Sequence, residues 1–225
     1  MNKKIGIKNE SSLHRTLKYQ YAGKDGKTEV KTGEYIADGL NKKGEFIEVQ
    51  TGSFAPLEKK VKEFASQSKV KIIYPIAVKK IIEVYSKQKR LLYKRKSPVK
   101  GSIWNIFDAL VYSPTIPLIK NVKIEVVLAD ITEKRIKDGK GSWRRKGISI
   151  YDKELAAFHD SIIFEKKSDF LRFIPFKKNE EFTVKTLAES AEVKILTARK
   201  ALYVLTKMKV VKRIGKKQRA WVYVR

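Results

Sequence analysis

The sequence predicts an α/β protein in which a mixed sheet is flanked by helices, and three observations carry that prediction. Apolar residues recur at helical spacing over residues 10–20 and again over residues 56–67. Residues 28–40 and 45–52 alternate between apolar and polar side chains, as half-buried strands do. Residues 69–78 form the apolar run of a buried strand. Helices and strands in this order describe a small α/β core.

The composition indicates a protein that binds a polyanion. Lysine and arginine number 51 against 24 aspartates and glutamates, so the 225-residue chain carries a formal net charge of +27. Each phosphate that lysine or arginine neutralises releases counterions and favours binding. We therefore expect DNA as the partner and leave RNA open. Hydrophobic residues make up 42% of the chain, which is enough for one large packed domain or two smaller ones.

Several classes of site and location are excluded by what the sequence lacks. The chain has no cysteine, which excludes disulfides, cysteine-bound zinc and thiol nucleophiles. It has two histidines, so a histidine-bound metal is not expected and His14 is predicted to be a packed or surface residue. No apolar run reaches the roughly 18 residues that span a membrane, and the N-terminus lacks the apolar segment of a signal peptide. We expect a cytoplasmic protein without a membrane partner, and a homodimer is left open.

The helices of the N-terminal part can be placed from their caps and apolar stripes. Asn9 or Ser11 can cap the first helix. One face of this helix carries Glu10, Leu13, His14 and Leu17. The second helix begins at Pro56, and its apolar stripe consists of Leu57, Val61 and Phe64. The segment "NKKG" (41–44) between the two alternating strands predicts a hairpin.

Further along the chain, four segments continue the α/β pattern. They are a very basic two-stranded hairpin over residues 81–101, a helix over 103–113, a long strand over 121–137 and a glycine-rich basic loop over 138–148. Residues 151–164 give mixed helix and strand signals. No internal repeat is visible.

The pattern changes near residue 180. Thr183 can cap a short helix, a longer helix follows over residues 195–208, and residues 209–225 form a hairpin with a basic tip at Gly215–Arg219. A helix, a turn, a second helix and a β-hairpin are the elements of a winged helix-turn-helix. We therefore predict two domains, residues 1–179 and residues 180–225.

The segment "YIADGLNKKGEFIEVQTG" (35–52) contains the predicted metal ligands. Residues two apart on a strand share a face, so Asp38 and Glu48 can converge if their strands pair as a hairpin. Two neighbouring carboxylates repel unless a cation lies between them. Mg²⁺ binds through one or two carboxylates and keeps several waters, so we predict Mg²⁺ (or Mn²⁺) on Asp38 and Glu48, with the carbonyl of Val49 as a further ligand.

This segment resembles the PD-(D/E)XK nuclease superfamily, which includes restriction endonucleases and archaeal Holliday-junction resolvases. The matching residues are Asp38, a turn, and then the run Glu48, Val49 and Gln50 in "GEFIEVQTG". Such nucleases commonly carry a further glutamate on the preceding helix, and Glu10 matches it. The resemblance covers roughly residues 8–80. It implies a restriction-endonuclease-like core with Glu10, Asp38, Glu48 and Gln50 in the catalytic site.

Gln50 departs from the superfamily pattern, which usually has lysine there to orient or polarise the attacking water. Some restriction enzymes of the superfamily carry glutamine at this place. Lys59 or Lys60, on the predicted second helix, can supply the missing charge.

The basic segments outside this motif predict contacts with nucleic acid. Two roles are left open for Trp143. It can pack against a sugar or base of the nucleic acid, or it can anchor its loop to the protein core. The early residues of a recognition helix meet the major groove, and a wing meets phosphates. The predicted contact residues are Arg95, Lys96, Trp143, Arg144, Arg145, Lys146, Lys194, Thr197, Arg199, Lys200, Lys216, Lys217 and Arg219.

Together these features predict a Mg²⁺-dependent DNA endonuclease that hydrolyses phosphodiesters. The alternative is a DNA-binding or regulatory protein that keeps the nuclease scaffold without turnover, and Gln50 is the residue that favours it. Winged helices also mediate protein contacts.

Overall fold

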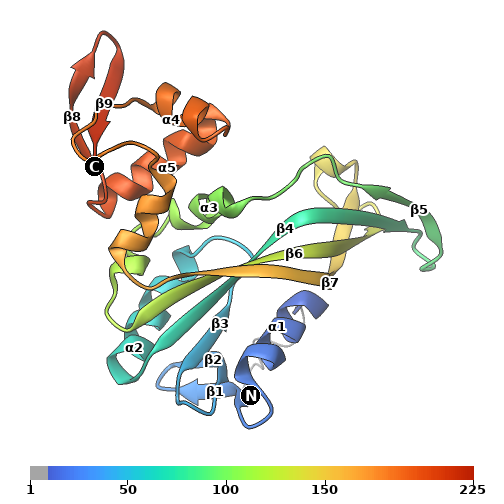
Figure 1. The fold of residues 1–225 in the computed structure, drawn as a ribbon. Coiled ribbons are helices and arrows are strands. Elements are labelled where there is room, and N and C mark those ends of the chain that lie inside the picture. Colours follow the sequence, from blue (N-terminus) through green and yellow to red (C-terminus); the bar gives the residue numbers. More distant parts are fainter. Residues whose placement is uncertain (1–9) are drawn as a thin grey trace.

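The computed structural model describes residues 10–225 and contains one large mixed sheet, several helices and a C-terminal helical module (Figure 1). The predicted α/β fold with a mixed sheet and flanking helices is confirmed. Ser11 caps the first helix by accepting a hydrogen bond from the His14 backbone N–H, whereas Asn9 lies outside the described residues. The α-helices are α1 (Ser12–Ala22), α2 (Glu58–Gln67), α3 (Ile106–Leu110), α4 (Val184–Ser190) and α5 (Ile195–Lys207).

The sheet has seven strands in the order β1-β2-β3-β4-β6-β7, and β5 pairs with the outer half of β4. The pairs β3–β4 and β4–β6 are parallel and the others are antiparallel. The strands are β1 (Lys27–Thr32), β2 (Tyr35–Leu40), β3 (Phe46–Val49), β4 (Val70–Tyr85), β5 (Leu91–Lys96), β6 (Val122–Lys137) and β7 (Ile148–Phe164).

Three strand predictions need correction. The segment 28–40 is two strands, because the chain turns back at Gly33, whose φ of 57° suits glycine. The buried strand predicted over 69–78 continues to Tyr85, since its outer half pairs with β5 and β6. The ambiguous segment 151–164 belongs to a 17-residue strand that pairs with β6 along its length.

The strands β4, β6 and β7 are much longer than the other strands of the sheet, and their outer halves extend past α1 together with β5 (Figure 1). We call this extension, made of residues 80–96 and 131–155, the arm. The glycine-rich loop 138–147 joins β6 to β7 at the end of the arm and contains the short 3-10 helix η5 (Trp143–Arg145). The strand β5 is exposed along its whole length.

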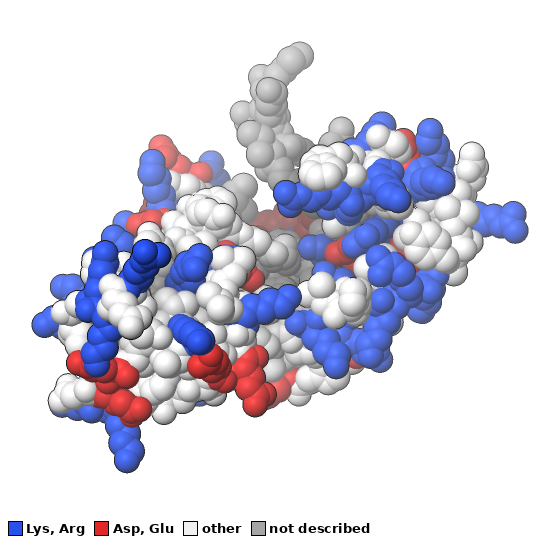
Figure 2. Space-filling view, turned by 90° about the horizontal axis from the view of Figure 1, so that it is seen from above, with Lys and Arg blue, Asp and Glu red and all other residues white. Residues whose placement is uncertain are grey.

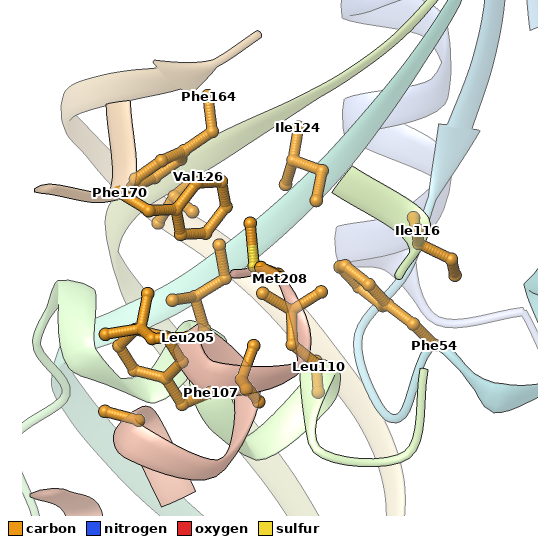
Figure 3. Packing of buried hydrophobic residues seen from close by; sticks show 14 of the residues in the cluster. Phe54, Phe107, Leu110, Ile116, Ile124, Val126, Phe164, Phe170, Leu205 and Met208 are labelled. Carbon is orange, nitrogen blue, oxygen red and sulfur yellow. The ribbon is translucent and has the colours of Figure 1, made fainter. Parts of the chain in front are cut away.

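The two faces of the sheet carry separate apolar clusters. On one face, Leu13 and Leu17 of α1 pack against Ile47, Ile73 and Val127. The other face packs against α2, α3 and the C-terminal module (Figure 3). The sheet therefore separates α1 from the C-terminal module, as Figure 1 shows.

The C-terminal module consists of α4, α5 and a hairpin of β8 (Lys212–Lys217) and β9 (Ala220–Val224). Thr183 caps α4 through the Thr186 backbone N–H, as predicted. The two helices and the hairpin occur in the predicted order, and their identification as a winged helix-turn-helix stays a prediction. Leu205 and Met208 belong to the same buried cluster as Phe107 and Leu110 of α3 (Figure 3). The boundary near residue 180 therefore crosses a continuous apolar core.

The remaining short segments are 3-10 turns. They are η2 (Ala55–Leu57), η3 (Ile103–Asn105), η4 (Ile116–Leu118) and η6 (Lys167–Phe173). Among residues 10–225, no helix has both the length and the apolar character needed to cross a membrane.

Candidate active site

Asp38 of β2 and Glu48 of β3 lie side by side. The register pairs Gly39 with Ile47 and Leu40 with Phe46, so the next position along each strand places Asp38 opposite Glu48. The Asp38 backbone N–H donates to Glu48 Oε1 at 3.2 Å, and the Val49 N–H donates to Asp38 Oδ2 at 2.8 Å. The hairpin therefore brings the two predicted metal ligands together through backbone hydrogen bonds.

Glu48 is a buried carboxylate, 2% exposed, whose closest cation is Lys60 of α2. The Lys60 ammonium lies 2.7 Å from Glu48 Oε2. Burial and the charge of Asp38 raise the pKa of Glu48 to about 7, although Lys60 and the Asp38 N–H oppose that shift. Lys60 therefore balances the negative charge of this carboxylate pair only in part.

His14 of α1 connects Asp38 with Glu10. Its Nε2 lies 3.0 Å from Asp38 Oδ2 and its Nδ1 lies 2.7 Å from Glu10 Oε1. Burial opposes protonation of the ring, but the hydrogen bonds and charges of Asp38 and Glu10 outweigh burial and raise the pKa of His14. Only the imidazolium can donate to both carboxylates at once. His14, which was predicted to be a packed or surface residue, is half-buried and contacts both carboxylates.

Asp38 and Glu10 both titrate below their ordinary range. Burial works against ionisation of Asp38, but His14, the Val49 N–H and Lys60 outweigh it and lower its pKa. Burial likewise opposes ionisation of Glu10, and Lys18 and His14 outweigh it. The Lys18 ammonium lies 2.8 Å from Glu10 Oε1. Glu10 thus lies near the carboxylate pair and is connected to Asp38 through His14, and its catalytic role stays a prediction.

Asp152 of β7 holds the first turn of α1 in place. Its Oδ1 accepts from the Ser12 N–H and its Oδ2 from the Ser12 hydroxyl, both at 2.8 Å. A carboxylate at a helix N-terminus satisfies free N–H groups and complements the helix dipole. Asp152 therefore fixes the helix that carries His14. It was not predicted, since 140 residues separate it from Ser12 in the chain.

A pocket of about 430 Å³ opens at this end of α1. It is lined by Glu10, Ser11, His14, Thr51, Ile150, Tyr151, Asp152 and Lys153. Four of these residues come from the start of β7, so the arm forms one wall of the pocket.

In the described part of the chain, the Gln50 side chain forms its hydrogen bond away from Asp38 and Glu48. Its side-chain amide donates to the Ser53 carbonyl at 2.8 Å, and its backbone N–H donates to the Ile73 carbonyl at 2.9 Å. The amide therefore ties down the loop after β3. Lys60, one of the two lysines named as a source of charge, supplies the cation next to Glu48, while Lys59 is exposed.

The carboxylate oxygens of Asp38 and Glu48 are ligands that suit a hard divalent cation. In this structure, His14 and Lys60 contact those oxygens. Within residues 10–225, no group of three or more His, Cys, Asp or Glu is arranged to hold a metal ion. Asp38 and Glu48 are two adjacent carboxylates, which suffices for Mg²⁺ with its waters. Their charges are met here by His14 and Lys60. The Val49 N–H faces Asp38, and the role of the Val49 carbonyl as a ligand stays a prediction.

The predicted nucleic-acid residues of the arm are largely exposed. Trp143 is 83% exposed, so it does not anchor its loop to the core. The Arg144 guanidinium lies 5.5 Å from the centre of the Trp143 ring. Arg145 Nε donates to the Ile148 carbonyl at 3.1 Å, which makes that arginine part of the loop structure. Arg95, Lys96 and Lys146 are also exposed.

The predicted contacts of the C-terminal module divide into two groups. Lys200 is 35% exposed and lies in a surface ion pair, with its ammonium 2.6 Å from Asp108 Oδ1 of α3. Lys217 is exposed and pairs with Glu181. Lys194, Arg199, Lys216 and Arg219 are also exposed, and Thr197 is half-buried.

Trp221 of β9 was missed by the sequence reasoning. The Arg213 guanidinium lies 3.9 Å and the Lys216 ammonium 4.5 Å from the centre of its ring. Its position opposite Lys216 follows from the β8–β9 register. Figure 2 shows lysine and arginine side chains over both the C-terminal module, at the left, and the arm, at the right.

The comparisons with other proteins place this site inside a family region. The family described as "Domain of unknown function (DUF8091)" matches residues 11–165, which include the arm and all the residues named for the pocket except Glu10. An uncharacterized protein of Treponema pallidum (strain Nichols) is 26% identical over 181 residues, which cover 80% of this chain and 72% of that protein. No solved structure matches significantly.

Proposed function

The chain belongs to the DUF8091 family, a domain of unknown function, and we propose that it is a Mg²⁺-dependent DNA endonuclease of the PD-(D/E)XK type. The observation that carries the proposal is the pairing of Asp38 with Glu48 across the β2–β3 hairpin, with Lys60 2.7 Å from Glu48. Two carboxylates and an adjacent cation, beside a pocket, suit chemistry on a phosphodiester.

The chain's own residues have separable roles in this proposal. Asp38 and Glu48 would hold the cation, and Mg²⁺ when bound would activate water and stabilise charge on a phosphoryl oxygen. Lys60 keeps a positive charge beside Glu48. His14 holds a proton on Nε2 next to Asp38, and Glu10 orients the imidazole through Nδ1. Lys153, on the wall of the pocket, is placed to bind phosphate.

A second candidate is a DNA-binding protein that keeps the scaffold without turnover. The hydrogen bond from the Gln50 amide to the Ser53 carbonyl favours it, because that amide is engaged away from the carboxylates. The direct contacts of His14 and Lys60 with the two carboxylates favour it as well, since a cation must displace or share them.

The net charge of +27 supports DNA as the partner for both candidates. We propose the C-terminal module as a winged-helix DNA-binding unit. It packs on the opposite face of the sheet from α1 and the pocket. It would therefore contact a stretch of DNA other than the one held at the pocket.

A cleavage assay with carboxylate variants separates the candidates. Purified protein is incubated with supercoiled plasmid, single-stranded DNA and branched DNA in Mg²⁺, Mn²⁺ or EDTA. We expect metal-dependent cleavage by the wild type, with Asp38→Ala and Glu48→Ala each losing at least the roughly hundredfold typical of a charge-stabilising group. DNA binding in EDTA should survive, because these carboxylates repel phosphate.

Glu34→Ala is the matched control, since Glu34 is an exposed carboxylate in the β1–β2 turn of the same part of the fold. It should cleave like the wild type. A wild-type protein that neither cleaves DNA nor binds Mg²⁺ or Mn²⁺ by calorimetry would rule out the endonuclease and favour the scaffold.

A further inference from the structure

The arm has two faces, and only one of them continues from the pocket. Ile131 of β6 and Leu155 of β7 pack in the cluster of α1, so they mark the face of the sheet on which α1 lies. Side chains two residues apart on a strand share a face. Moving two residues along β6 from Ile131 reaches Glu133, which therefore lies on the same face, and so do its partners across the sheet.

The register identifies the rest of this face. Glu133 pairs with Ile82 and Lys153, and Ile82 pairs with Arg95. Lys153 also lines the pocket. The pocket is thus joined to β5 by one row of side chains that crosses four strands. We call the side of the arm that carries this row the pocket face, and the opposite side the far face.

The two faces differ in charge. The pocket face carries Lys80, Arg95, Arg135 and Lys153, with Glu133 in the row and Asp152 in the pocket lining, where Asp152 accepts hydrogen bonds from Ser12. The Arg135 guanidinium lies 2.6 Å and the Lys80 ammonium 3.6 Å from Glu133 oxygens. Within residues 10–225, neither Arg95 nor Lys153 has an ion-pair partner.

The far face is balanced by its own carboxylates. The Lys94 ammonium lies 3.0 Å from Glu83 Oε1, and Lys134 pairs with Glu154. Lys96, which pairs in register with Ile81, also lies on the far face. Arg95 and Lys96 were predicted together as nucleic-acid contacts, and the register places them on opposite faces.

We propose that the pocket face of the arm binds the phosphate backbone of duplex DNA directly beside the phosphate held at the pocket. This inference rests on the proposed function for the position of the scissile phosphate. Strands lie roughly 4.8 Å apart, so Lys153 and Arg95 are separated by roughly 14 Å across the sheet. That spacing is comparable with the width of the major groove of B-DNA, about 12 Å, so the two cations can meet phosphates on both strands.

Charge complementarity selects this occupant over a second copy of the chain. Among residues 10–225, β4 is the strand that pairs with β5, and β5 carries Lys94, Arg95 and Lys96 in succession. Pairing two such edges would place like charges against one another, a recognised device against edge-to-edge association. A polyanion removes that repulsion.

The test uses neighbouring cations of one strand. Binding of a duplex of about 20 base pairs, roughly two helical turns, is measured in EDTA at several salt concentrations for the wild type, Arg95→Ala and Lys94→Ala. We expect Arg95→Ala to weaken binding severalfold and to reduce the slope of log K against log salt by about 0.9, the loss of one phosphate contact. Lys94→Ala should leave the slope unchanged.

Equal effects of Arg95→Ala and Lys94→Ala on binding would overturn the proposal, because they would show that cations on both faces of the arm contribute equally to DNA binding. A larger effect of Arg95→Ala on single-stranded DNA or duplex RNA than on duplex DNA would overturn the choice of partner. Since these measurements need no cleavage, they can succeed if the endonuclease proposal fails. Cleavage by a wild type whose two arm variants bind normally would sink this inference alone.

Discussion

The Lys60 ammonium of α2 lies 2.7 Å from a carboxylate oxygen of Glu48 on β3, and this contact joins a surface helix to the least exposed charge of the site. The superfamily pattern that the sequence resembles has its lysine two residues after the glutamate, where this chain has Gln50. Here a cation reaches the glutamate from ten residues further along the chain than Gln50. The electrostatic environment of Glu48 therefore depends on how α2 packs as well as on the strand motif.

Lys60→Ala should remove DNA cleavage and reduce stability. Without Lys60, a buried carboxylate loses its cation, and removing one partner of a buried pair costs roughly 3–5 kcal/mol. Because burial already raises the pKa of Glu48 to about 7, the penalty should grow as pH rises through that value, where Glu48 must carry its charge. Urea unfolding in EDTA at pH 6 and pH 8 measures this difference.

Lys59→Ala is the control for that experiment, since Lys59 is the exposed neighbour on the same helix. It should change neither cleavage nor stability. If Lys60→Ala cleaved DNA at the wild-type rate, Lys60 would have no catalytic role.

Gln50→Lys should keep or raise the cleavage rate. The substitution restores the residue that the resembled superfamily commonly has, and it removes the hydrogen bond to the Ser53 carbonyl, worth roughly 1 kcal/mol. Single-turnover rates of the wild type, Gln50→Lys and Gln50→Ala compare charge with simple loss of the amide. A rate that falls equally in both variants would assign Gln50 to the loop alone.

The pairing of Asp38 with Glu48 could be predicted from the sequence because strand periodicity and a short connection determine register. The contacts of His14 could not, because they depend on how α1 docks on the sheet. The i, i+4 spacing of Glu10 and His14 was the available signal, since such pairs meet on one side of a helix turn. The chain separation between Ser12 and Asp152 left no local signal at all.

The strand β7 shows why part of the fold was ambiguous. Its segment "YDKELAAFHD" contains good helix formers such as glutamate, leucine and alanine, and its outer residues are exposed. Continuous pairing with β6 decides its conformation, which is a tertiary effect that strand propensity does not contain.

Glu125→Gln should make stability less dependent on acid pH. Glu125 of β6 is buried, and its Oε1 accepts from the Tyr21 hydroxyl at 2.6 Å while Lys71 lies 3.0 Å from Oε2. Burial opposes ionisation, but Tyr21 and Lys71 outweigh it and lower the pKa of Glu125. A carboxylate with a lowered folded pKa stabilises the fold above its unfolded pKa, and that contribution is lost as pH falls through the folded pKa.

We therefore expect Glu125→Gln to be less stable than the wild type near pH 7, by roughly 1–3 kcal/mol. The difference should shrink as pH falls below about 4.5, the ordinary value for glutamate. Urea unfolding from pH 7 to pH 3 measures it. A constant difference across that range would show that the carboxylate charge does not contribute.

Leu205→Ala tests whether the C-terminal module is an independent domain. Leu205 of α5 is fully buried in a cluster that also contains Phe107 and Leu110 of α3 (Figure 3). Truncating a buried leucine costs roughly 2–5 kcal/mol, because apolar contacts are lost and a cavity remains. If the cluster is one cooperative core, the whole unfolding curve should shift by this amount as a single transition, followed both by tryptophan fluorescence and by far-UV circular dichroism.

Ile36→Ala serves as the comparison, since Ile36 is a half-exposed aliphatic residue of β2 that does not belong to this buried cluster. It should cost much less than Leu205→Ala. Two separated transitions in Leu205→Ala, with the later one at the wild-type midpoint, would instead show that residues 180–225 unfold by themselves. In that case the predicted boundary near residue 180 divides two stable units, and removing the C-terminal module should leave a folded core that can be assayed for cleavage.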